Sequence, residues 1–121
     1  MSYIDGFVLP IKEDKLDEYR PMAEKFERKA IALGAIASVE SIGDGLQHGK
    51  RTDFFKAVQA EEGENVIFSF VIWPDKATRD AGWEKIMSDP EMQPGDMPFD
   101  GKRMFWGGFN PFVNTLEKSD G

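Results

Sequence analysis

The stretch Val-Ile-Phe-Ser-Phe-Val-Ile-Trp-Pro-Asp, residues 66–75, constrains the fold more than any other part of the sequence. Seven of its first eight residues are β-branched or aromatic, which predicts a β-strand that ends at Pro74. Both alternating sets of side chains along this strand are mainly apolar, so we expect both of its faces to be buried. Asp75 can cap the helix that follows, which is predicted over Lys76 to Met87.

Another helix is predicted over residues 16–33, where apolar side chains recur at spacings of three and four with charged residues between them. Asp14 is the expected N-cap, because its carboxylate can accept a free backbone N–H of the first turn. Gly34 is the expected stop. Pro21 lies inside this range, and an interior proline costs about 3 kcal/mol. We therefore expect a kink at Pro21, or a helix that begins near Arg20.

Three further segments have the composition of strands. They are Tyr3–Ile11, Ala35–Ile42 and Arg103–Val113, the last of them interrupted by Gly107-Gly108, which predicts a bulge or a close backbone approach. Thr52–Gln59 is predicted as an additional short strand or hairpin arm through its Phe, Ala and Val residues. The main elements thus follow the order strand, helix, strand, strand, helix, strand.

That order is typical of the ferredoxin-like split βαβ class of α+β folds, an antiparallel sheet with two helices on one face. A length of 121 residues fits a single domain over 1–121. Helices on one face leave the other face of the sheet bare, yet the two-faced strand at 66–73 is apolar there. We expect a second copy to cover it in a homodimer. The alternative is that residues 43–60 and 91–101 fold over the sheet.

The amino-acid composition limits the kinds of binding partner and of chemistry that we expect. The sequence has 22 Asp and Glu against 15 Lys and Arg, a net charge of −7, so we predict that the protein binds neither nucleic acid nor an anionic membrane. It has no cysteine, which leaves out disulfides and thiolate chemistry. No signal-peptide pattern and no run of 18 apolar residues is present, so the expected location is the cytoplasm.

Three polar residues in the middle of the chain are candidates for a site. His48 is the single histidine, in a glycine-rich loop. Because iron and zinc sites normally use two or three imidazoles, we predict no metal and no cofactor there. Glu40 and Asp53 can form a carboxylate pair for acid–base chemistry, although their spacing does not determine their distance and solvent-exposed charges are the simpler interpretation.

The C-terminal part of the chain adds three more candidates. Lys102 and Arg103 follow an Asp-Gly turn and can bind an anionic ligand. Trp106, like Trp73 and Trp83, belongs either to the core or an interface or to an aromatic pocket for an organic ligand. The sequence contains no dinucleotide-binding or phosphate-binding glycine motif, no nucleophile elbow and no calcium loop.

Several longer motifs resemble the YbaA-like bacterial family of unknown function. They are Tyr3-Ile4-Asp5-Gly6-Phe7-Val8, Thr52-Asp53-Phe54, the run 64–90 with its Arg79-Asp80, and Met97-Pro98-Phe99-Asp100-Gly101-Lys102-Arg103-Met104. The resemblance implies a dimeric α+β barrel, a superfamily that includes cofactor-free monooxygenases, lactone isomerases and members with no known activity. The family's polar motif positions fall on Asp5, Asp53, Arg79, Asp80, Asp100, Lys102 and Arg103.

Two functional hypotheses follow. In the first, the protein is a small-molecule binding protein or a cofactor-independent enzyme, with Glu40 or Asp53 as base and Lys102 or Arg103 as anion anchor. In the second, it is a non-catalytic stress or accessory protein that acts as a dimer. A pocket lined by aromatic and polar side chains favours the first, and a fully packed sheet face favours the second.

Overall fold

The protein folds as one antiparallel sheet covered on one face by helices. A computed structural model describes residues 1–93 and 95–116. The strands are β1 (Tyr3–Lys12), β2 (Ala37–Ile42), β3 (Glu64–Trp73) and β4 (Phe105–Phe109), in the order β2-β3-β1-β4. Every neighbouring pair is antiparallel. This order is that of the split βαβ pattern, and the α+β class predicted from the sequence is confirmed.

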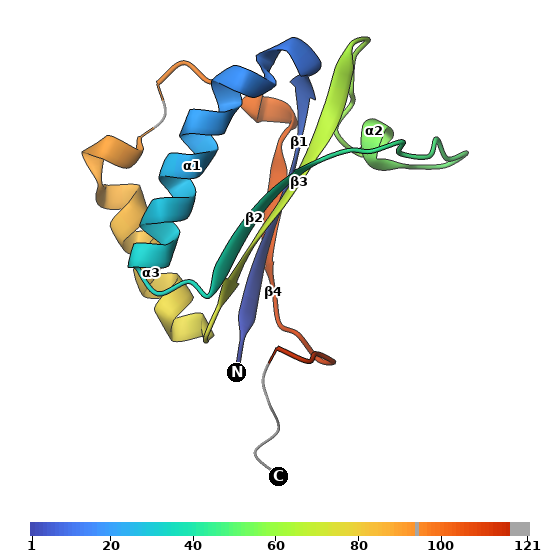
Figure 1. Cartoon of the computed structure of the whole chain (residues 1–121). Coiled ribbons are helices and arrows are strands. Elements are labelled where there is room, and N and C mark those ends of the chain that lie inside the picture. Colours follow the sequence, from blue (N-terminus) through green and yellow to red (C-terminus); the bar gives the residue numbers. More distant parts are fainter. Residues whose placement is uncertain (94, 117–121) are drawn as a thin grey trace.

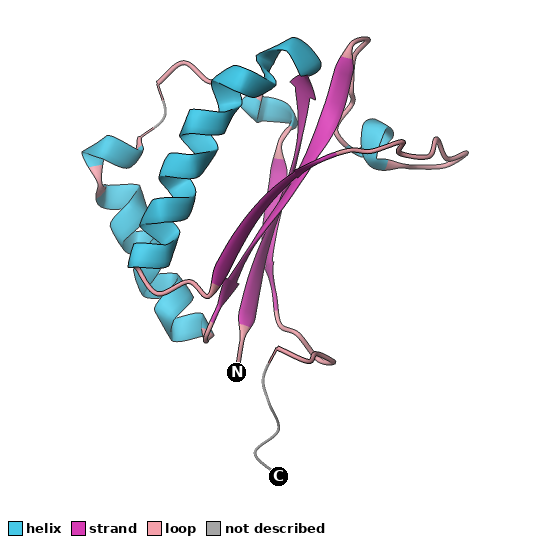
Figure 2. Cartoon of the chain, viewed as in Figure 1, coloured by secondary structure: helices cyan, strands magenta, loops and turns pink. Residues whose placement is uncertain are grey.

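Two long helices form the second layer. Figure 1 shows α1 (Leu16–Ala32) and α3 (Lys76–Ser88) on the same side of the sheet, and Figure 2 separates the two layers by colour. The short α2 (Phe54–Ala57) lies in the long β2–β3 connection, on the opposite side. Single turns of 3-10 helix are the remaining helical elements of the described residues, at Glu13–Lys15, Pro90–Met92 and Gly101–Arg103. No helix in residues 1–93 and 95–116 is long and apolar enough to cross a membrane.

The core lies between the sheet and the two long helices. Alternate side chains of β1 point toward the helices, and their register partners on β3 do the same. One cluster joins Tyr3 and Trp73 to Ala30 of α1, and a second joins Leu9 and Ile67 to Tyr19 of α1. The helix-facing stripe of α1 was predicted from the spacing of its apolar residues. This packing holds α1 against β2 and β3, where the candidate site is found.

Some local expectations from the sequence are wrong. Thr52–Gln59 is not a strand; residues 54–57 form helix α2, because the Asp53 carboxylate accepts the backbone N–H of Lys56 and caps a helical turn. Asp14 does not cap α1, whose cap residue Lys15 has no side-chain bond, because a 3-10 turn at Glu13–Lys15 leads into the helix. The alternative start near Arg20 is also wrong.

The glycine pair of β4 allows close packing and makes no bulge. The β1–β4 register runs without a break from Ile4 opposite Phe109 to Val8 opposite Phe105. A Cβ atom on Gly108 would lie 2.3 Å from the hydroxyl oxygen of Tyr3, which faces the helices. A side chain at Gly108 would therefore require Tyr3 to shift. Strand β4 is also shorter than the predicted Arg103–Val113.

The sheet face away from the helices is only partly covered. The β2–β3 connection covers one end, where Val58 packs on Val8 and Val66. The 91–101 segment does not cover this face, since its Phe99 packs on the helix side of the sheet. Over the rest of this face four apolar side chains are exposed, which we call the open sheet face: Val39 (37%), Phe68 (44%), Phe105 (47%) and Phe109 (61%).

Candidate functional site

A cleft separates α1 from the edge strand β2. Its volume is about 330 Å³, near the lower end of the range for ligand pockets. Figure 1 shows the two elements that form its walls. We call it the Tyr19–Glu40 cleft, after the two polar side chains that meet in it. Its lining consists of Leu16, Tyr19, Arg20, Ala23, Glu24, Glu27, Glu40, Ser41, Ile42 and Ile67.

A short hydrogen bond joins the two walls. The Tyr19 hydroxyl donates to Oε1 of Glu40 over 2.6 Å, and the two residues are 21 positions apart in the chain. Tyr19 is 6% exposed because it belongs to the inward stripe of α1, where its ring packs edge-on against Phe99. Glu40 stands opposite Ser69 in the β2–β3 register, and the Ser69 hydroxyl also bonds to its carboxyl group. The carboxyl group is therefore held in place from both α1 and β3.

The surroundings of Glu40 make its carboxyl group easier to protonate than an exposed one. Burial raises the pKa of its carboxyl group above the ordinary value of 4.5, and the nearby negative charge of Glu27 raises it further. The bonds from Tyr19 and Ser69 lower this pKa but do not cancel the effect of burial. Burial, and then the charge of Glu40, also raise the pKa of the Tyr19 hydroxyl, which keeps its proton as a donor. A glutamate of this kind can exchange a proton closer to neutral pH than an exposed one can.

His48 and Asp53 lie elsewhere, in the β2–β3 connection. His48 stacks on Phe55, and its Nδ1 is 4.0 Å from Oδ2 of Asp53, too far for a hydrogen bond. Asp53 accepts the backbone N–H groups of Lys56 and Gly49, which lower the pKa of its carboxyl group. Among the described residues no group of three or more His, Cys, Asp or Glu could hold a metal ion.

The basic pair near the C-terminus is directed inward to carboxylates. Arg103 donates to both carboxylate oxygens of Glu64, over 2.6 and 2.8 Å, and to Asp100 over 3.0 Å. With these partners its guanidinium group offers little to an anionic ligand. Lys102 is exposed, and its backbone N–H is capped by Asp100. Trp106 is 62% exposed on β4, opposite Phe7 of β1, and it does not line the cleft.

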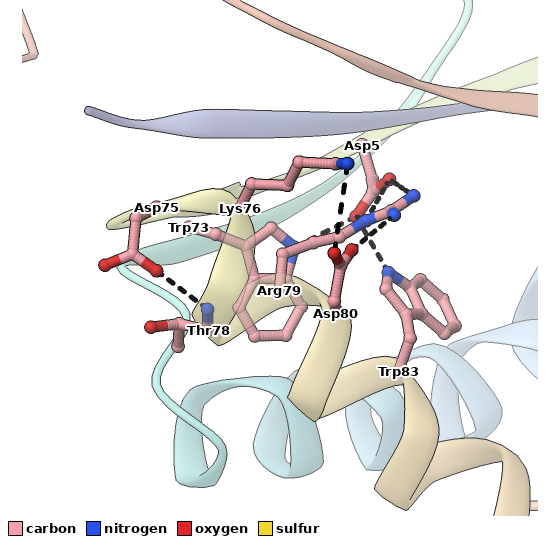
Figure 3. A network of polar contacts seen from close by, with 8 residues as sticks. All are labelled: Asp5, Trp73, Asp75, Lys76, Thr78, Arg79, Asp80 and Trp83. Carbon is pink, nitrogen blue, oxygen red and sulfur yellow. Dashed lines mark hydrogen bonds and ion pairs between the residues drawn. The ribbon is translucent and has the colours of Figure 1, made fainter.

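A second polar cluster, which the sequence did not predict as a unit, lies between β1 and α3. Figure 3 shows the Asp5 carboxylate surrounded by donors. Trp73 and Trp83 donate their indole N–H groups to Oδ2 over 3.0 and 2.8 Å, and Arg79 donates from Nε and from Nη2, the latter over 2.7 Å. Asp5 is 1% exposed. We call these four residues the Asp5 cluster, and their burial indicates that the cluster stabilises the fold.

One pattern in the sequence could have predicted the Asp5 cluster. Asp5 alternates with Tyr3 and Phe7 on the inward face of β1, between aromatic side chains. A carboxylate in such a row must be paired, because burying a charge without partners is very costly. The pattern thus requires a cationic partner for Asp5 but does not identify Arg79.

The fold and the cleft together define a ferredoxin-like α+β domain with a polar cleft between its first helix and an edge strand. The chain belongs to the family described as "Protein of unknown function (DUF1428)", whose model matches residues 2–101. It is 47% identical over 116 residues to the "Uncharacterized protein YbaA" of Escherichia coli strain K12, covering 94% of this chain and 99% of that protein. The Shigella flexneri protein of the same name matches equally.

These findings confirm the resemblance found in the sequence, and they assign no reaction. Among solved structures, the designed protein Foldit4 matches with a TM-score of 0.44 and 10% identity, over 92% of this chain and 99% of the designed one. At that TM-score the likeness supports no conclusion about fold or function.

Proposed function

We propose that this protein binds a small organic molecule in the Tyr19–Glu40 cleft, with Glu40 as the group that exchanges a proton with the ligand. The hydrogen bond of 2.6 Å between Tyr19 and Glu40, made inside a cleft of about 330 Å³, carries the proposal. Apolar residues of both walls offer contact area for a ligand, and the carboxyl group offers one point of polar recognition.

The geometry favours acid–base chemistry that needs no cofactor. The raised pKa of Glu40 lets its carboxyl group accept or donate a proton at a higher pH than an exposed glutamate does. Tyr19 holds one oxygen of this carboxyl group in position. Asp53 and Arg103, the alternative base and anion anchor from the sequence, are already occupied by partners within the protein.

A fragment titration followed by backbone amide NMR tests this function. Fragments that bind should shift the signals of residues 19–27 and 40–42 together, because these segments form the two walls. Glu40→Gln should weaken the binding, while His48→Ala, an exposed position outside the cleft, should leave it unchanged. Shifts that map to another surface, or a library in which nothing binds, would contradict the proposal.

A second candidate function rests on the open sheet face. We propose that two copies pair through Val39, Phe68, Phe105 and Phe109. As such a dimer, the protein would serve as a non-catalytic accessory or stress protein in the cytoplasm. Four exposed apolar side chains on one sheet face favour burial against a partner. A twofold arrangement lets the same face serve on both copies.

Sedimentation analysis tests the pairing. Phe68→Glu and Phe109→Glu should convert a dimer into a monomer, because each places a charge in the proposed interface. Phe112→Glu is the matched control, since Phe112 is 96% exposed and lies beyond the end of β4. A wild-type protein that sediments as a monomer at micromolar concentration would contradict the pairing, and the cleft proposal would stand.

A further inference from the structure

The Tyr19–Glu40 cleft carries negative charge that the protein does not neutralise. Its lining contains three carboxylates, Glu24, Glu27 and Glu40, against one guanidinium, Arg20. None of the three carboxylates makes an ion pair with another described residue. Three buried or half-buried carboxylates elsewhere in the described residues are matched with cations: Asp5 with Arg79, Glu64 with Arg103, and Asp89 with Lys29.

The carboxylates of the cleft act on one another. The charge of Glu27 raises the pKa of Glu40 on the opposite wall, and also that of Tyr19 on its own helix. Like charges this close are unfavourable, and a positive charge placed between them would relieve the repulsion. The protein supplies no such charge from β2 or β3, where the cleft lining is Glu40, Ser41, Ile42 and Ile67.

The spacing of the carboxylates argues against a metal ion as that charge. A bound metal ion needs several ligands converging on one point within about 2.0–2.6 Å. Within the described part of the chain, no three acidic, histidine or cysteine side chains converge in that way. Carboxylates spread along the two walls suit a larger cation, whose charge and hydrocarbon occupy different parts of the cleft.

We propose that the ligand of the Tyr19–Glu40 cleft is a small organic cation, a protonated amine on a short apolar body. This inference rests on the proposed function of the cleft and specifies its ligand class. The ammonium group would donate to the Glu40 carboxylate, with Glu27 as the second negative group. The apolar body would lie on Ala23, Ile42 and Ile67, three apolar residues of the lining, of which Ile42 and Ile67 are register partners on β2 and β3. The small volume restricts the ligand to a compact molecule.

A set of three probes of similar size tests the charge preference. Benzylamine, benzyl alcohol and benzoate differ mainly in the charge of one group, and their affinities can be measured by NMR titration at neutral pH. Benzylamine should bind about tenfold more tightly than benzyl alcohol, as expected for one hydrogen bond to a charged group, and benzoate should bind most weakly. The preference should decrease as salt is added.

Four variants assign the preference to the cleft. Glu40→Gln should reduce the affinity for benzylamine about tenfold and leave benzyl alcohol nearly unchanged. Glu27→Gln should act in the same direction, and it provides a second test should Glu40→Gln disturb folding. Arg20→Gln should strengthen the binding of benzylamine, because it removes the positive charge of the lining. Glu84→Gln, an exposed glutamate on α3, is the control and should change nothing.

The outcomes separate this inference from the proposed function. Should benzoate or benzyl alcohol shift the cleft signals at lower concentration than benzylamine, the ligand is not a cation, although the cleft still binds organic molecules. Benzylamine binding that is unaffected by both Glu40→Gln and Glu27→Gln would overturn the inference in the same way. If none of the three probes binds while other fragments do, the inference fails alone; if the whole library fails to shift residues 19–27 and 40–42, both fail.

Discussion

Replacing Asp5 by asparagine removes the charge from the most deeply buried carboxylate among the described residues while it keeps the shape of the side chain. Its oxygen Oδ2 accepts from Trp73, Trp83 and Arg79, and Oδ1 accepts twice from Arg79. An amide has only one oxygen. Whichever way the asparagine turns, its NH₂ group faces N–H donors and leaves them without an acceptor.

The expected loss of unfolding free energy follows from the burial of the ion pair between Asp5 and Arg79. Breaking a buried ion pair by removing one partner costs about 3–5 kcal/mol, because the other charge stays in place without compensation. Arg79 is 18% exposed, so water can recover part of this loss, and we expect a value near the lower end, about 3 kcal/mol. Since single domains are stable by roughly 5–15 kcal/mol, such a change is large.

Urea unfolding at one fixed protein concentration, followed by tryptophan fluorescence, measures this loss. Trp73 and Trp83 report on the Asp5 cluster directly. The matched control is Asp80→Asn, because Asp80 bonds to the same guanidinium over 3.0 Å but is 51% exposed. An exposed ion pair contributes about 0–1 kcal/mol, so the control should shift the midpoint little.

Equal losses in Asp5→Asn and Asp80→Asn would refute the reasoning, since burial would then have no effect on the value of the pair. A double variant extends the test. Replacing Asp5 by leucine and Arg79 by methionine together removes both charges, and the double variant should be more stable than Asp5→Leu alone. A double variant as unstable as the sum of its single changes would show that the two side chains are not coupled.

The remaining predictions concern one packing contact, one helix cap and one pH effect. Gly108→Ala should destabilise the protein by about 1–3 kcal/mol in urea unfolding, because the new methyl group meets the Tyr3 hydroxyl, whereas Gly95→Ala, with open space around it, should be neutral. Asp75→Ala should cost about 1 kcal/mol by loss of the α3 cap, and a neutral result would contradict the capping role. Because the pKa of Glu40 is raised in the folded protein, its contribution to stability is fully present below about pH 4.5 and is lost as pH rises through the folded pKa. Glu40→Gln should therefore match the wild type in acid and become the more stable of the two toward neutral pH; a constant difference across this range would contradict the raised pKa.

Most of the fold could be predicted from local patterns. The two-faced apolar run at β3, the three-and-four spacing of α1 and the Pro-Asp pair before α3 each depend on neighbours within a few residues. The prediction failed at residues 52–59, where aromatic residues typical of a strand form α2 instead. There one capping carboxylate, Asp53, outweighed the propensity of a segment too short to have a clear period.

The candidate site could be predicted only in part. Glu40 was a candidate base from the sequence, but Tyr19 counted only as one apolar position of a helix. Lys102 and Arg103 were expected to bind a ligand, and Arg103 instead binds Glu64, 39 residues away. The spacing of residues along the chain indicates on which face of its helix or strand a side chain lies. It does not indicate which side chain of another element it contacts.

The sequence by itself determined the main elements, their order and the need for partners. A carboxylate at Asp5 among aromatic residues required a cation, and an apolar row on both faces of β3 required two covers, because burying charge or exposing apolar surface is unfavourable wherever it occurs. Only the tertiary structure decided which residues meet those needs. Arg79 reaches Asp5 across 74 positions and Tyr19 reaches Glu40 across 21. Such pairings depend on how helices pack on the sheet, and that packing is determined by the whole core together rather than by any single stretch of chain.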